Sequence, residues 1–133
     1  MDEETLEDFL NNWQDEQEQN KLGFIQLRDT LTAQQGVVLT FHSRPGLTYS
    51  LRAARYGQKK PLFVMIDVIE DSPRWLSICF FNEMVQDPEE RGSFVPGGLL
   101  GEDALCFDIE ICTEDALRYI EDRLHEAFDA AAS

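Results

Sequence analysis

Positive charge is scarce in this chain. Its 133 residues contain 11 lysines and arginines against 26 aspartates and glutamates, and the formal net charge is −15. A field of that sign opposes binding to polyanions, so we do not expect nucleic acid as a partner. The sequence also has no apolar run that approaches the roughly 20 residues of a membrane-spanning helix, and we expect no membrane association.

The chain also has few cysteines. The three cysteines are Cys79, Cys106 and Cys112, and no two of them have the C-x-x-C spacing of metal or redox pairs. We therefore predict three reduced, buried thiols that pack as small apolar side chains. The N-terminal residues 1–5 are acidic and contain no apolar core segment, which argues against a secretory signal and favours a cytoplasmic location.

Two apolar runs occupy the middle of the chain. Residues 62–69 and 75–81 are nearly continuous apolar segments on either side of a short polar stretch that contains Pro73. This pattern is typical of two central strands joined by a tight turn. Two β-rich segments, 37–41 and 49–56, precede them with similarly short turns. Short links favour antiparallel neighbours, so we predict a four-stranded antiparallel meander.

Helical patterns flank the meander. Leu6, Phe9, Leu10 and Trp13 form one apolar stripe within residues 3–19, although the stripe stops over residues 14–20. A second helical pattern covers residues 22–34. Near the C-terminus, Thr113 is a predicted N-cap for a final helix with a continuous apolar stripe.

The remaining segment is irregular. Residues 86–103 contain four of the eight glycines and two of the five prolines, and we predict a long loop. Residues 104–111 then alternate in polarity, as a half-exposed fifth strand does.

These patterns predict one α+β domain. Residues 1–35 form its helical N-terminal part, 36–85 the antiparallel meander, 86–103 the long loop, and 104–131 a strand and the C-terminal helix. The sheet has about five strands, and the N-terminal helix or helices and the C-terminal helix pack on it.

Charge is distributed unevenly along the chain. Residues 21–61 hold seven bases and one acid, whereas residues 1–20 hold eight acids and no base. The basic segment supplies five candidate ligand-binding residues around two adjacent turns: His42, Arg44, Arg52, Arg55 and Tyr56. Arginine and tyrosine side chains can hold a small anion or an acidic peptide. The simpler alternative is that these bases neutralise the chain's own acids.

Motifs for catalysis and cofactors are missing. There is no G-x-S-x-G or H-E-x-x-H sequence and no nucleotide fingerprint, and we predict no catalytic residue, no cofactor and no metal site. One alternative is a small enzyme that uses Cys79 or Cys106 with His42 as base. Another is an acidic metal-binding protein, because Cys106, Asp108 and Glu110 share one face of the predicted fifth strand. That mixture of ligands suits zinc poorly.

Three local sequences accompany this order of elements: Gln-Asp-Pro-Glu at 86–89, Pro-Gly-Gly-Leu-Leu at 96–100, and the helix at 120–128. Together they resemble the small bacterial YjbR, YdhG and TfoX-N-terminal-like families, which share a secretion-chaperone-like α+β fold. Some members have been proposed to bind DNA, a role that the net charge of −15 opposes. A frataxin-like protein, whose acidic first helix binds iron, has the same broad order of elements.

We therefore predict a non-catalytic binding or adaptor domain in the cytoplasm. Its expected partner is a protein or a small anionic ligand, and a homodimer remains open.

Overall fold

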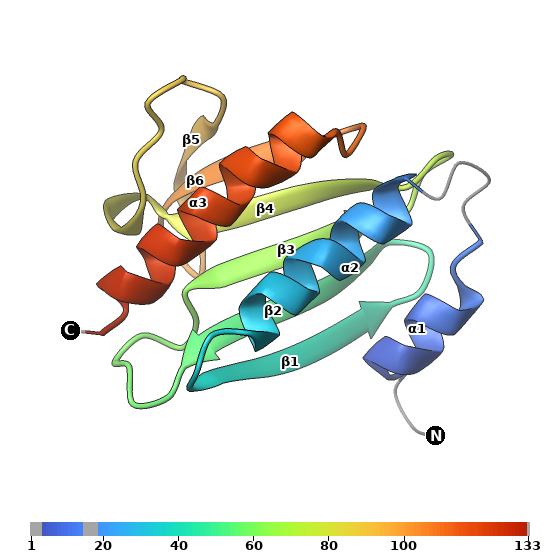
Figure 1. The fold of residues 1–133 in the computed structure, drawn as a ribbon, viewed down its shortest axis with the longest axis horizontal. Helices are drawn as coiled ribbons and strands as arrows, with labels where there is room; N and C mark the ends of the chain where they lie inside the picture. Colours follow the sequence, from blue (N-terminus) through green and yellow to red (C-terminus); the bar gives the residue numbers. More distant parts are fainter. Residues whose placement is uncertain (1–3, 15–18, 133) are drawn as a thin grey trace.

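The computed structural model describes residues 4–14 and 19–132. This part of the chain folds into one α+β domain with a six-stranded antiparallel sheet of order β1-β2-β3-β4-β6-β5 (Figure 1). The fold class is as predicted, but the sheet has six strands rather than about five. The elements are α1 (Leu6–Asn12), α2 (Gln19–Thr32), β1 (Val37–Arg44), β2 (Thr48–Arg55), β3 (Val64–Ile69), β4 (Trp75–Phe81), the short 3₁₀ helix η1 (Asn82–Met84), β5 (Ser93–Leu99), β6 (Glu102–Ile109) and α3 (Glu114–Ala130).

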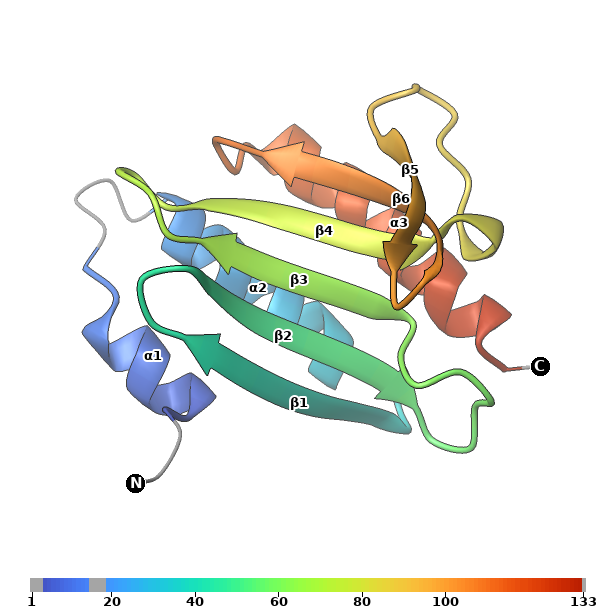
Figure 2. The ribbon, with the colours of Figure 1, turned by 180° about the vertical axis from the view of Figure 1, so that it is seen from behind.

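The two long helices, α2 and α3, lie side by side on the same face of the sheet (Figure 1). Seen from behind, the opposite face of β1 to β4 carries no helix. At the side of the sheet away from β1, β5 crosses in front of β6 (Figure 2). The main core lies between sheet and helices. Its fully buried strand residues, such as Leu51, Ile66 and Ile78, alternate along the strands, as a sheet with one covered face requires. Leu27 of α2 and Leu124 of α3 pack against them and are also fully buried.

The N-terminal helices differ from their predicted bounds. The first helix, whose apolar stripe lies within residues 3–19 and was expected either to continue or to break after residue 14, ends at Asn12. The Thr5 hydroxyl caps it by accepting from the Asp8 amide. Trp13 is nevertheless buried, as its place in the apolar stripe predicts. Most of the interrupted stripe at residues 14–20 lies outside the described residues, and α2 is already helical from Gln19.

The predicted meander is confirmed, with β1 to β4 adjacent in chain order. At the first turn, the Leu47 amide donates to the Arg44 carbonyl at 2.9 Å, and Gly46 has a φ of +83°. With Pro45 before it, this is the type II turn that a Pro-Gly pair favours, because the third residue needs a positive φ. This tight turn fixes the register in which β1 and β2 pair.

The predicted loop at 86–103 is wrong for its second half, where β5 forms an edge strand on β6. Pro96 and two glycines in this segment predict a loop rather than a strand. An edge strand tolerates proline because one side of it makes no hydrogen bonds to a neighbouring strand. The first half is held by Asp87, whose carboxylate accepts from the amides of Arg91 and Gly92 and from the Tyr119 hydroxyl. β6 also ends earlier than expected, so Ile111, predicted to point inward, is 59% exposed.

Buried polar contacts fasten the N-terminus of α2 to neighbouring segments. The Asn20 side chain is 5% exposed; it donates to the carbonyls of Arg74 and Glu110 and accepts from the Cys112 amide, at 2.7 to 2.8 Å. The last helix starts as predicted, with the Thr113 hydroxyl accepting from the Ala116 amide.

Candidate functional site on the helix-free sheet face

The alternation of side chains puts every second residue of β1 to β4 and β6 on the helix-free face. The strand register aligns five polar residues from five strands across it, and we call them the polar row: His42, Ser50, Asp67, Ser77 and Asp108. Arg44 and Arg52 are the next residues of the same parity along β1 and β2. They therefore lie on opposite sides of the row, and three of the five predicted ligand residues share one face.

Asp67 is the unusual member of the polar row. It lies in the centre of β3 and is only partly exposed, although no helix covers this face. Its Oδ1 atom is buried and makes no hydrogen bond to the described residues. Burial raises the pKa of the Asp67 carboxyl, whereas a hydrogen bond from Ser50 and the positive charges of Arg52 and Arg44 act in the opposite direction.

Arg44 and Arg52 also differ from most other arginines. Within the described residues, no carboxylate lies within 4.0 Å of either guanidinium. Arg52 donates instead from Nε to the hydroxyl of Ser50 at 3.2 Å. Five arginines do form ion pairs, namely Arg28, Arg74, Arg91, Arg118 and Arg123. The helix-free face therefore carries positive charge that the described acids do not neutralise directly.

The other two predicted ligand residues lie elsewhere. Arg55 has the parity of the helix-covered face; its Nη1 donates to the Phe128 carbonyl at 3.1 Å, and its guanidinium lies 4.2 Å from that ring's centroid. Tyr56 follows the end of β2 and is 85% exposed. At ~3.3 Å per residue it is about 20 Å along the chain from Ser50 of the polar row, whereas Arg52 is about 7 Å from it. The structure thus separates both residues from the Arg44–Arg52 surface.

The alternative that the basic segment neutralises the chain's own acids holds for part of it. Arg28 lies 3.6 Å from Glu7 in α1. Lys60 contacts both Glu83 and Glu102, and it lines a groove of about 540 Å³ at the end of the sheet near the C-terminus of α3. The Lys60 charge is already balanced there, which leaves Lys59 as the one groove-lining base without an ion pair in the described region, whereas the helix-free face carries two such bases.

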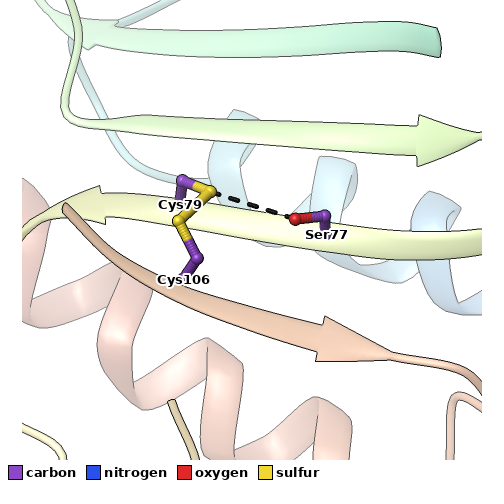
Figure 3. Close-up of a disulfide and its surroundings, with 3 residues drawn as sticks. All are labelled: Ser77, Cys79 and Cys106. Atoms are coloured by element: carbon purple, nitrogen blue, oxygen red, sulfur yellow. Dashed lines mark hydrogen bonds between the residues drawn. A yellow bond between two sulfur atoms is a disulfide. The ribbon is translucent and has the colours of Figure 1, made fainter. Parts of the chain in front are cut away.

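The prediction of three reduced thiols is wrong in this structure. Cys79 of β4 lies directly opposite Cys106 of β6, with their Cα atoms 4.1 Å apart, and the two form a disulfide (Figure 3). The bond lies on the helix-free face, where Ser77 Oγ is 3.9 Å from Cys79 Sγ. Cys112 is buried as predicted, against Gly23 of α2.

The residues of the two alternative sites are not brought together. His42 lies on β1 and Cys79 on β4, three strand spacings or about 14 Å apart. Within the described residues, no group of three His, Cys, Asp or Glu side chains is placed to hold a metal ion. Cys106, Asp108 and Glu110 follow one another along the strand, but the Cys106 sulfur is taken by Cys79.

Sequence reasoning missed Asp67 and Ser50. The available signal was Asp67 itself, a single acid inside the apolar run 62–69. A charge in a buried strand usually has a specific partner or task, but which residues surround it depends on strand pairing.

Among the described helices, none is both long and apolar enough to cross a membrane. Comparison with known proteins found no matching family model, no matching curated protein and no matching solved structure.

Proposed function

We propose that this protein is a non-catalytic binding domain whose helix-free sheet face holds an anionic group of a partner. The observation that carries the proposal is the state of Arg44 and Arg52. In a chain with 26 acids and 11 bases, both lie on one face without a carboxylate within 4.0 Å in the described region. A carboxylate supplied by a partner would complete charge-assisted hydrogen bonds there.

The neighbours of the two arginines support the same proposal. Asp67 lies close enough for the charges of Arg52 and Arg44 to lower its pKa, but it forms no ion pair with either guanidinium group in the described region. His42 lies between Arg44 and Thr40 on β1, exposed, and can donate a hydrogen bond. An anion held by His42, Arg44 and Arg52 would lie over the β1–β2 end of the polar row.

A cytoplasmic location, a relationship to the YjbR-like families and a homodimer remain proposals that rest on the sequence. The disulfide bears on the first of these, because disulfides are rare in reducing compartments. The ratio of bonded to reduced Cys79 and Cys106 in protein taken directly from cells would test it.

The experiment is an NMR titration of the ¹⁵N-labelled protein with hexaglutamate, with hexalysine as the opposite probe. A chain of charge −15 repels hexaglutamate in general, so binding requires a local basic site. We expect the amides of β1 and β2 around His42, Arg44 and Arg52 to shift. If hexaglutamate shifts no amide at millimolar concentration, or shifts those around Lys59 and Lys60 instead, the proposal is wrong.

A further inference from the structure

The two edges of the sheet are built differently. At one edge, β5 contains Pro96 and two glycines, and its pairing with β6 shifts register between Val95 and Leu99. Proline and bulges are devices that stop another strand from adding to an edge. This edge is therefore protected.

The opposite edge, β1, has none of these devices. Its eight residues pair with β2 in one unbroken register, from Val37 opposite Arg55 to Arg44 opposite Thr48. The strand contains neither proline nor lysine. α1 lies beside its C-terminal end on the helix-covered side, where the Phe41 ring lies 5.4 Å from that of Phe9 and the Ser43 hydroxyl donates to Glu4. Neither view shows a helix beside its N-terminal half (Figures 1 and 2).

The phase of the hydrogen bonds shows which backbone groups face outward. The Tyr56 amide donates to the Gly36 carbonyl at 2.8 Å, in the same register as the β1–β2 pairs. Hydrogen-bonded pairs alternate in an antiparallel ladder, so Thr40 and His42 bond to β2. The amides and carbonyls of Leu39 and Phe41 consequently face away from β2.

We propose that β1 accepts an extended acidic segment of a protein partner as an additional strand. This inference rests on the proposed function and names the partner for the same face. If Leu39 and Phe41 bond to the added strand, Thr40, His42 and Arg44 become its closely spaced, non-hydrogen-bonded positions. Side chains opposite them on the helix-free face would lie ~5 Å away, the shortest cross-strand separation.

Charge and polarity then specify the partner's sequence. Acidic residues at alternate positions would meet His42 and Arg44 directly. They would also approach Arg52, which lies behind the short side chain of Thr40 on the neighbouring strand. The intervening residues of the partner would lie beside Leu39 and Phe41, which are half-buried against the core. The partner's segment is therefore alternating acidic and apolar.

The test is selection of a random nonapeptide library, followed by amide hydrogen exchange with the most enriched peptide. We expect acids at alternate positions, and at least tenfold slower exchange of the Leu39 and Phe41 amides in the complex. Selection against Arg44→Glu/Arg52→Glu should lose the acidic preference, whereas selection against Lys59→Glu/Arg118→Glu, a matched change at exposed sites, should keep it.

The other outcomes each contradict the inference in a distinguishable way. If acidic peptides bind and shift the Arg44 and Arg52 signals but leave exchange at Leu39 and Phe41 unchanged, strand addition is wrong and the proposed function stands. If no acidic peptide is enriched, both are wrong. If the two amides become protected without peptide as protein concentration rises, a second copy pairs at this edge and the acidic partner is wrong.

Discussion

Arg52 donates a hydrogen bond from Nε to the hydroxyl of Ser50, two residues earlier on β2, at 3.2 Å. Ser50 is 5% exposed, so its position is fixed by its surroundings. The bond occupies one donor of the guanidinium and leaves the others for a ligand. Arg52 is therefore held in place on the helix-free face without being neutralised.

Two arginines three residues apart should respond differently to substitution. Arg55→Ala removes a hydrogen bond to the Phe128 carbonyl and a cation–π contact with the Phe128 ring. We expect it to lower the free energy of unfolding by about 1–2 kcal/mol. Arg52→Ala should cost less, about 0.5–1 kcal/mol, because it removes one hydrogen bond to Ser50 and a charge near Asp67 but no packing against the core. Urea denaturation of both variants measures this, and equal losses would show that Arg52 is structural.

Asp67→Asn should stabilise the protein at neutral pH. Because burial raises the pKa of Asp67 in the folded state, folding is less favourable once this carboxyl is ionised. Protonation of Asp67 therefore stabilises the folded state. This contribution is complete below the pKa that Asp67 has in the unfolded chain, and it is lost as pH rises through the pKa in the folded state. The melting temperature of Asp67→Asn should exceed that of the parent protein at neutral pH.

The same difference should shrink as pH falls through the folded pKa of Asp67 toward the unfolded value, about 3.9 for aspartate. Thermal denaturation of both proteins across this pH range supplies the measurement. A variant that is less stable at neutral pH would mean that the ionised carboxylate is needed for folding.

The Cys79–Cys106 disulfide closes a sequence separation of 27 residues. By loop-closure entropy, the double change Cys79→Ala/Cys106→Ala should cost about 3.5 kcal/mol of unfolding free energy. Reductant should lower the stability of the parent protein by a similar amount and leave the variant unchanged. Three titratable thiols in the denatured, unreduced protein would contradict the bond.

Asn20→Ala should be among the most damaging single changes. It leaves the Arg74 and Glu110 carbonyls and the Cys112 amide without their side-chain partner. We expect a loss of about 3 kcal/mol, since buried groups left unsatisfied carry most of their desolvation cost. Thr32→Ala, at an exposed position at the end of the same helix, is the control and should cost little. Similar denaturation midpoints for the two variants would contradict this role of Asn20.

Much of the fold could be predicted because it depends on local patterns. Apolar, β-rich runs and short turns specify the meander, and the Thr113 cap specifies the start of α3. β5 was not predicted, because its proline and glycines usually end a strand in the interior of a sheet. An edge strand can contain them.

The site was predictable only in part. His42, Arg44 and Arg52 share a parity that strand periodicity provides. The same periodicity places Arg55 on the other face, but Tyr56 could not be separated from them without knowing where β2 ends. The pairing of Cys79 with Cys106 depends on β4 lying next to β6, with β5 between them in the chain but not in the sheet.

Arg44 and Arg52 form the proposed site for a partner's carboxylates. The most direct test is the Kd of hexaglutamate for the parent protein, for Arg44→Ala/Arg52→Ala and for Lys59→Ala/Arg118→Ala, which removes the same charge at exposed positions. We predict that the first variant stays folded and loses at least tenfold in affinity, about 1.4 kcal/mol, and that the control loses less than twofold. Equal affinity losses in the two variants would show that only net charge matters and would contradict the claim.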